Sequence, residues 1–222
     1  MLVSVFFLLT IYAVHHAHSL DCRVVEEGHQ FTSTTPFYGF NHNQVISIRV
    51  RFDNNTAWYL FPSTDNKGRS CTQSWNQLWG STRCGFLTNN HQDSDRFVWR
   101  RAGSCMNYDP QGHVTGEKPN CPEADLVELG ASAYNDGLNP YEHLKVLHKE
   151  FKTRARVDTW YRLKMQFDES QTIYELSDDA DELLESQTID HHHCLEYHHG
   201  MIQGFYFGGE CPAPQAVSVC YD

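Results

Sequence analysis

An alternation of apolar and polar side chains at Asp93–Arg101 constrains the fold of this chain most tightly. Successive side chains of a β-strand point to opposite faces, so a strand here directs Phe97 and Trp99 toward a core. The opposite face then carries four side chains: Ser94, Arg96, Val98 and Arg100. A face with two arginines and a serine is suited to form the base of a binding site for an anionic ligand. It also fits an ordinary solvated strand face, which is the norm in antiparallel sheets.

The same alternation is clear at Val45–Phe52 and Trp160–Phe167, with a hairpin turn at Asp168–Ser170. Shorter strands are expected at five further places: Trp58–Phe61, Trp75–Gly80, Cys105–Tyr108 beside the Asp93–Arg101 strand, Met201–Phe207 and Gln215–Tyr221. Many short strands with turn signals between them predict one all-β sandwich.

Three segments break this pattern. Asp109–Tyr141 is rich in Pro, Gly and Asn and is expected to be a long irregular loop. Tyr141–Phe151 has an apolar stripe that predicts a short helix, and Asp178–Glu185 is expected to be a solvated, acidic helical insert. The predicted fold therefore has little helix and long loops.

The first 19 residues predict a secretory signal peptide, because an apolar run is followed by small residues before Leu20. Residues 20–222 would then be a single secreted domain, and no other stretch is apolar enough to span a membrane. The eight cysteines all lie in that domain and predict a disulfide framework whose pairing the spacing does not fix. Asn54-Asn55-Thr56 is an N-glycosylation sequon. The net charge of −11 disfavours a nucleic-acid partner.

Ser94-Asp95-Arg96-Phe97-Val98-Trp99-Arg100 resembles the Ser-x-Arg-Phe-x-Trp-Arg strand of polysaccharide lyase family 14, a family of alginate and glucuronate lyases. Thr159–Lys164 is similar to a later strand of that family. Gly204–Gly209, with Pro212-Ala213-Pro214, is similar to its closing segment. The resemblance covers roughly residues 45–221 and implies a β-jelly roll that cleaves acidic, uronate-containing polysaccharide by β-elimination, without a metal or organic cofactor.

Such a reaction needs cations to neutralise the uronate carboxylate, a base for the C5 proton and an acid for the leaving oxygen. By the resemblance, Arg96 matches the carboxylate-binding arginine, Ser94 the family's serine and Tyr108 the first of two tyrosines. Pro110 stands where the second tyrosine is expected. Tyrosine can move the proton when neighbouring cations lower its pKa.

The family's catalytic lysine has two candidate positions. Lys67 lies at about the right distance before Ser94, whereas aligning Leu78-Trp79-Gly80 with the family's Leu-Tyr-Gly puts Ser74 at the lysine position and predicts a damaged activity. Three more cations are candidate substrate-binding residues: Arg100, Arg162 and Lys164.

Alternatives stay open for each of these assignments. Arg96 and Arg100 are equally expected to be solvated or to pair with acids such as Asp95, and Tyr108 and Lys67 to be plain surface residues. The chain is then either a non-catalytic, secreted carbohydrate-binding jelly roll or a disulfide-rich secreted protein with no sugar site. The histidine cluster His191–His199 contains metal-ligating residue types, but its spacing matches no known metal motif, so we expect no metal there.

Overall fold

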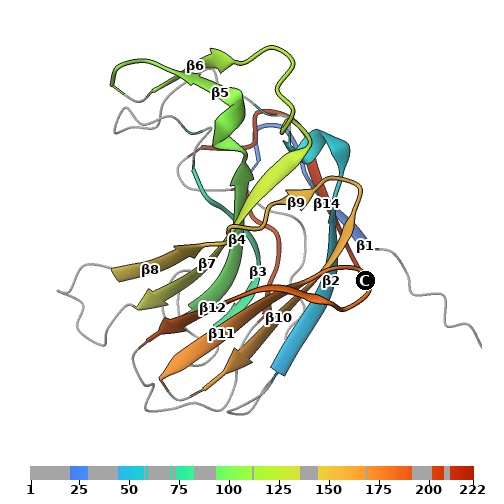
Figure 1. The fold of residues 1–222 in the computed structure, drawn as a ribbon, viewed down its shortest axis with the longest axis vertical. Coiled ribbons are helices and arrows are strands. Elements are labelled where there is room, and N and C mark those ends of the chain that lie inside the picture. The colour runs from blue at the N-terminus through green and yellow to red at the C-terminus, as the bar shows by residue number, and fades with distance from the viewer. Residues whose placement is uncertain are drawn as a thin grey trace, which may run out of the picture.

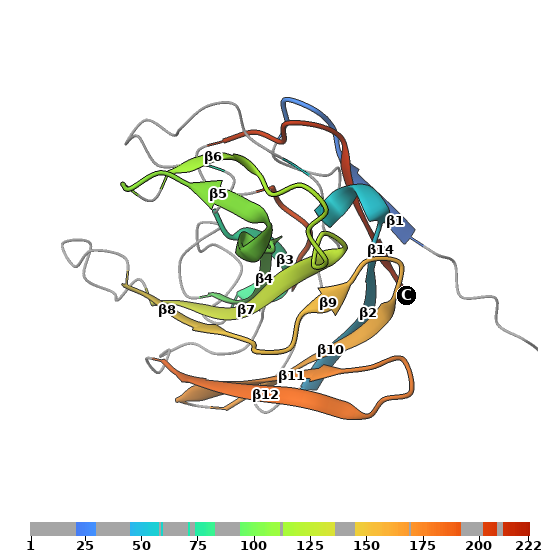
Figure 2. The same ribbon diagram turned by 45° about the horizontal axis from the view of Figure 1, so that its top comes forward.

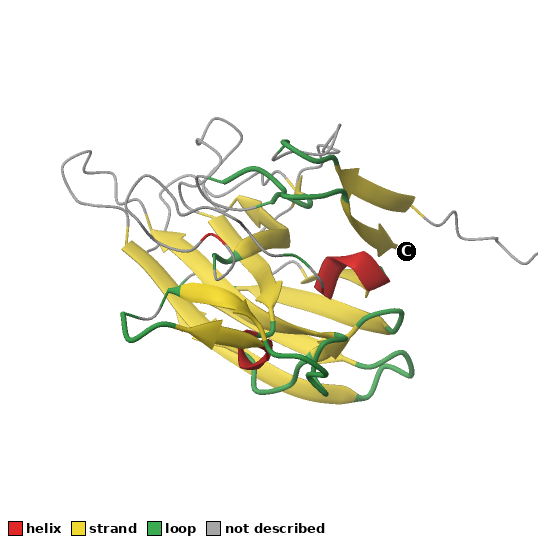
Figure 3. Cartoon of the chain, turned by 90° about the horizontal axis from the view of Figure 1, so that it is seen from above, coloured by secondary structure: helices red, strands yellow, loops and turns green. Residues whose placement is uncertain are grey.

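The computed structural model describes residues 21–29, 45–57, 59, 71, 74–82, 94–111, 113–135, 145–168, 170–191, 202–207 and 211–222. Over these residues the chain is an all-β sandwich of two facing antiparallel sheets, as predicted (Figures 1 and 2). Two short 3-10 helices are described over their full length: η1 (Asn54–Ala57) and η3 (Gly103–Cys105) (Figure 3). None of the described helices is long or apolar enough to cross a membrane.

Sheet A contains six strands in the spatial order β1-β14-β2-β10-β11-β12. Their bounds are β1 Asp21–Val25, β14 Val217–Tyr221, β2 Val45–Phe52, β10 Trp160–Phe167, β11 Gln171–Ser177 and β12 Leu183–Asp190. The strand order departs from the chain order because β14 lies between β1 and β2. Such long-range returns, together with the facing sheets, make this the jelly-roll type of sandwich that was predicted.

Sheet B follows the order β13-β3-β4-β7-β8, and β9 also pairs with β7. Its strands are β13 Ile202–Gln203, β3 Asn76–Thr82, β4 Ser94–Arg101, β7 Leu126–Asn135, β8 Lys145–Glu150 and β9 Ala155–Arg156. A separate hairpin of β5 (Met106–Tyr108) and β6 (Val114–Glu117) stands off the end of β4 (Figure 2). The strand expected beside β4 at Cys105–Tyr108 therefore pairs elsewhere, since η3 redirects the chain after Arg101.

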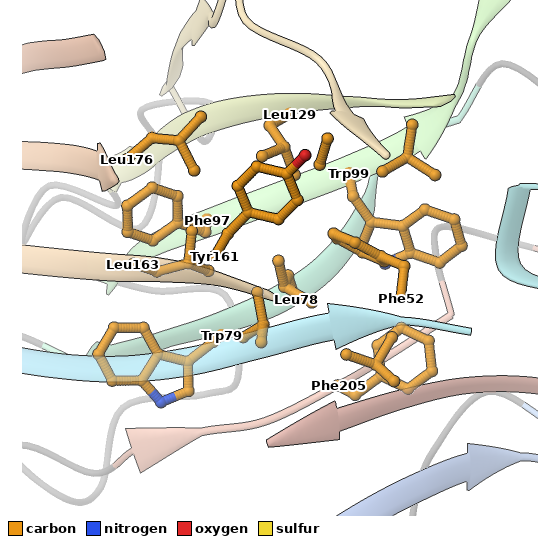
Figure 4. Packing of buried hydrophobic residues seen from close by; sticks show 14 of the residues in the cluster. Phe52, Leu78, Trp79, Phe97, Trp99, Leu129, Tyr161, Leu163, Leu176 and Phe205 are labelled. Atoms are coloured by element: carbon orange, nitrogen blue, oxygen red, sulfur yellow. The ribbon is translucent and has the colours of Figure 1, made fainter. Parts of the chain in front are cut away.

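The core fills the space between the sheets (Figure 4). Phe97 and Trp99 are both fully buried, as the alternation of β4 predicts. Phe97 packs edge-on against Tyr174 of β11 with ring centroids 5.3 Å apart, and Trp99 lies 5.9 Å from Phe52 of β2. Each of these contacts joins the two sheets, and burying aromatic side chains of this size is a dominant source of stability.

Two helix predictions are wrong. The Tyr141–Phe151 stripe contains strand β8, and Asp178–Glu185 is a tight turn that runs into β12. In that turn the Asp178 carboxylate accepts hydrogen bonds from the backbone N–H groups of Ala180 and Glu182 at 2.9 and 2.8 Å. The expected loop Asp109–Tyr141 is also more regular than predicted, because it contains β6 and β7. The strand expected at Trp58–Phe61 falls largely outside the described residues.

Three disulfides lie within the described part of the chain, which confirms the framework that the cysteine count predicts. They join Cys22 to Cys220, Cys71 to Cys211 and Cys105 to Cys121. The first spans 198 residues and ties β1 to β14, while the third closes a 16-residue segment around the β5–β6 hairpin. Cys84 and Cys194, the predicted signal peptide and Lys67 lie outside the described residues.

Candidate functional site

The polar face of β4 is buried. Ser94 and Arg96 are 0% and 2% exposed, and only Arg100 is half-buried. This corrects the simplest interpretation of the sequence, in which an arginine on this face is solvated. Burying a cation costs free energy unless polar groups compensate its charge. The groups around Arg96 therefore decide how large this cost is.

The Arg96 side chain starts close to β3, where its register partner Gly80 has no side chain. A Cβ atom at Gly80 would lie 2.9 Å from Arg96 Cγ and 2.1 Å from the carbonyl oxygen of Asp95. The guanidinium Nε donates to Ser94 Oγ at 3.1 Å, and Nη1 donates to Gln77 Oε1. These two acceptors fix the orientation of the guanidinium.

His148 of β8 faces the same side of sheet B, and sequence reasoning missed it. Ser132 of β7 pairs in register with both Arg96 and His148, so the three residues form one row across β4, β7 and β8. His148 Nδ1 lies 2.8 Å from Ser132 Oγ, and a Cβ at Gly130 would lie 2.6 Å from the imidazole Cε1. Gly80 and Gly130 therefore leave room above the sheet for the two functional side chains.

The surroundings of His148 keep its imidazole neutral near pH 7. Burial lowers the pKa of His148; Glu150 opposes that shift and Arg100 adds to it. Nε2 is buried and has no hydrogen-bond partner among the described residues. When Ser132 Oγ accepts from Nδ1–H, this second nitrogen carries the lone pair, which is the form a general base requires. Trp75 packs 4.6 Å from the imidazole, centroid to centroid.

Arg100 belongs to an ion-pair cluster next to this row. Its Nε lies 2.7 Å from Glu128 Oε2, its Nη2 lies 3.2 Å from Glu150 Oε1, and its guanidinium stacks 4.2 Å from the Trp75 ring centroid. The alternative of acidic partners therefore holds for Arg100, although the acids are Glu128 and Glu150. Two carboxylates already balance its charge, which argues against the predicted substrate contact.

Tyr108 is not brought together with Arg96. It lies on the β5–β6 hairpin, 45% exposed, and its hydroxyl donates to the carbonyl oxygen of Gly103 at 3.2 Å. Arg100 is near enough to act on it electrostatically, and Arg100 is four residues, or about 13 Å, along β4 from Arg96. Burial raises the pKa of Tyr108, outweighing the lowering by Arg100. Arg100 and Arg101 do lower the pKa of Tyr108, but the net shift is upward, contrary to the expectation from the sequence.

Arg162 and Lys164 are also separated from Arg96. They lie on β10 in sheet A, on the side that faces away from the core. Arg162 pairs with Asp181, and Lys164 Nζ lies 2.7 Å from Glu175 Oε2. Of the predicted site residues that the structure describes, Ser94, Arg96 and Arg100 lie on sheet B, Arg162 and Lys164 lie on sheet A, and Tyr108 lies on the separate hairpin. Only Ser94 and Arg96 join His148.

No protein-family model matches the chain, and no curated protein sequence matches it. Among solved structures, it is similar to an alginate lyase from Klebsiella pneumoniae, with a TM-score of 0.46 and 8% identity. That match covers 80% of this chain and 56% of the lyase. It is also similar to an endo-β-1,4-glucuronan lyase from the fungus Trichoderma reesei, with a TM-score of 0.46, 10% identity, and 91% and 77% of the two chains covered.

Metal-ligating side chains do not gather within the described residues: no group of three His, Cys, Asp or Glu is placed to hold an ion there. Of the histidine cluster only His191 is described. It is 8% exposed, and its Nε2 lies 3.0 Å from Thr172 Oγ1, so it is part of the sheet A packing.

Proposed function

We propose that this chain is a secreted polysaccharide lyase that cleaves uronate-containing polymers such as alginate or glucuronan by β-elimination. The observation that carries the proposal is the row formed by Arg96, Ser132 and His148, which sets a charged guanidinium and a neutral imidazole on one face of sheet B. Three disulfides support secretion, because such bonds persist in oxidising compartments.

Each residue of the row has a chemical role in the proposal. Arg96 binds the uronate carboxylate, for which its planar fork is suited, and Gln77 and Ser94 orient it. His148 Nε2 takes the proton from C5, the C4–C5 double bond forms, and the C4–O4 bond breaks. The departing oxygen takes up a proton from solvent. Holding the carboxylate against a fixed positive charge stabilises the anionic transition state.

In this proposal His148 replaces Tyr108 as the base. The tyrosine lies at the far end of β4 and has a raised pKa, whereas the imidazole has a lowered pKa and shares the row with Arg96. Lys67 keeps its predicted assisting role only as an expectation from the sequence.

The test is turnover of alginate and glucuronan, followed by the absorbance of the unsaturated product at about 235 nm, together with two variants. His148→Gln and Arg96→Lys should each lower kcat/KM about 10²–10³-fold while far-ultraviolet circular dichroism stays unchanged. His113→Gln is the matched control, since His113 is exposed and pairs with Asp109 on the β5–β6 hairpin. Absence of turnover by the wild type on both polymers, or full activity of His148→Gln, would refute the proposal.

One observation favours a second candidate, a non-catalytic carbohydrate-binding jelly roll. Arg96 is only 2% exposed, and its Nε and Nη1 already donate to Ser94 and Gln77. A protein that only binds sugar would retain alginate on a column without any rise in product absorbance, and this outcome separates the two candidates.

A further inference from the structure

The outward face of sheet A carries a cluster of cations around one tryptophan. We call it the Arg/Trp face; it consists of Arg49, Arg51, Trp160, Arg162 and Lys164. In the register of β2 and β10, Arg49 is opposite Arg162 and Arg51 is opposite Trp160. The guanidinium carbons of Arg49 and Arg51 lie 5.1 and 5.4 Å from the indole centroid, within the range of cation–π attraction. The indole therefore holds two of the cations in place.

This arrangement is unfavourable without counter-charges, because like charges directly opposite each other destabilise a strand pair. The β11–β12 turn supplies them: Asp179 pairs with Arg49, and Asp181 pairs with Arg162. Both carboxylates are more than half exposed, at 57% and 60%. The β11–β12 turn thus places two carboxylates beside arginines of its own sheet and neutralises their charge.

The remaining cations of the face have partners of unequal quality. Arg49 Nη1 also lies 2.7 Å from Asp222 Oδ2, and Lys164 lies 2.7 Å from Glu175. Arg51 is less well satisfied: its Nη2 lies 3.5 Å from Asp53 Oδ1 and 3.6 Å from Cys220 Sγ. Its buried Nε has no hydrogen-bond partner among the described residues. Arg51 is therefore the least tightly paired cation of the face.

We propose that the Arg/Trp face is a second binding surface for uronate polysaccharide, on which carboxylates of the polymer displace Asp179 and Asp181 from Arg49 and Arg162. Exposed ion pairs contribute only about 0–1 kcal/mol each, so a polymer with many carboxylates can exchange for them through multivalency. The ligand class rests on the proposed function, but binding at this surface needs no catalysis.

The position of the surface gives it a distinct role. Arg49 and Arg162 point away from the core on sheet A, and Arg96 and His148 point away from it on sheet B. A polymer bound on the Arg/Trp face keeps the protein attached while another stretch of polymer occupies the row on sheet B.

The experiment measures the binding of the wild type and three double variants to immobilised alginate. Binding is measured in 50 mM and 150 mM NaCl, at which the Debye length is roughly 14 and 8 Å. Arg49→Gln/Arg162→Gln should weaken binding about tenfold or more, and Asp179→Asn/Asp181→Asn should strengthen it several-fold. The charge-matched control Arg23→Gln/Arg156→Gln, which also removes two arginines paired with aspartates, should bind like the wild type.

Opposite effects of the two Arg/Trp-face variants exclude misfolding as the common cause. Two results would overturn the proposal that this surface binds alginate. One is an equal loss of affinity in the control and in Arg49→Gln/Arg162→Gln, and the other is no gain of affinity in Asp179→Asn/Asp181→Asn. Turnover of short uronate oligosaccharides is measured in parallel and should be unchanged in all four proteins. If the wild type binds alginate through Arg49 and Arg162 without any turnover, the surface stands and the proposed lyase activity falls.

Discussion

The arginines on the two outward faces of this sandwich follow the same sequence pattern and have opposite environments. Arg96 on sheet B is 2% exposed and donates to the neutral groups of Ser94 and Gln77. Arg49 and Arg162 on sheet A have side chains 30% and 35% exposed and pair with carboxylates of a surface turn. Alternating arginines therefore predict only the direction of a side chain, whereas the neighbouring strands decide whether its charge is solvated, paired or buried.

The buried arginine and the exposed ion pairs also differ in what they cost in folding free energy. Burying a charged side chain costs free energy that an exposed ion pair does not incur, unless the surrounding groups compensate the charge. A residue retained at such a cost is a candidate for function, and this is why the proposed chemistry is placed on sheet B.

The largest expected effect comes from filling the space under Arg96. Gly80→Ala places a Cβ 2.1 Å from the Asp95 carbonyl oxygen and 2.7 Å from Arg96 Cα, both backbone atoms that cannot turn aside. We expect a loss of about 3 kcal/mol or more in the free energy of unfolding. Urea denaturation measures it, with Gly204→Ala as the control because a Cβ there meets nothing within 4 Å. Equal losses in both variants would contradict the close packing described for sheet B.

The next test removes one acceptor from an arginine on each face. Gln77→Leu deprives buried Arg96 of a hydrogen bond and should destabilise the fold by about 1.5–3 kcal/mol. Asp179→Asn weakens the exposed pair with Arg49 and should cost only about 0–1 kcal/mol. The two unfolding midpoints are compared in urea; similar shifts would mean that burial does not distinguish the two faces.

The pH dependence follows from the lowered pKa of His148. Because its pKa is lower in the folded state than in the unfolded state, the unfolded state binds more protons as the pH falls below about 6.5. Its contribution to stability is therefore complete above that pH and is lost as the pH falls toward the folded-state value. His148→Gln should flatten this part of the stability curve, measured by urea denaturation between about pH 4.5 and 7.5. Parallel curves for the two proteins would disprove the shift.

The same residue sets the expected pH profile of catalysis. The base must be neutral, so kcat/KM should rise with pH through an apparent pKa below the usual histidine value. A profile whose limb lies near the pKa of tyrosine would instead support Tyr108 as the proton carrier.

The smallest effect concerns salt. Raising NaCl from 0.1 M to 1 M screens exposed charges, so the coupling between Arg162 and Asp181 should fall from about 0.2–1 kcal/mol toward zero. A double-mutant cycle with Arg162→Gln and Asp181→Asn measures it by urea denaturation. A coupling that does not respond to salt would place this pair in the buried class with Arg96.

The strands with strict alternation could be predicted from the sequence. Val45–Phe52, Ser94–Arg101 and Trp160–Phe167 each bury one face against the core, and their two-residue period has no helical equivalent. The faces of Phe97, Trp99 and Arg96 followed from that period alone.

His148 could not be found in the same way. The apolar residues of Tyr141–Phe151 fit a helical stripe as well as a strand, and only pairing with β7 resolves the ambiguity. The signal that sequence reasoning overlooked is the small-residue alternation Gly130, Ser132 on β7, which leaves space beside Arg96 and His148. The expected place of Tyr108 beside β4 was wrong, because the turn at Gly103–Cys105 and the disulfide from Cys105 to Cys121 carry it onto a separate hairpin.

The place of β14 in sheet A has a consequence for biosynthesis. Residues 217–221 pair on one side with β1 and on the other with β2, and the Cys22–Cys220 bond joins β1 to β14. During translation both early strands remain without this neighbour until the ribosome has released residues 217–221. Sheet A therefore closes only after residues 217–221 have been made, and until then β1 and β2 each have an open edge at which wrong strand pairing can begin.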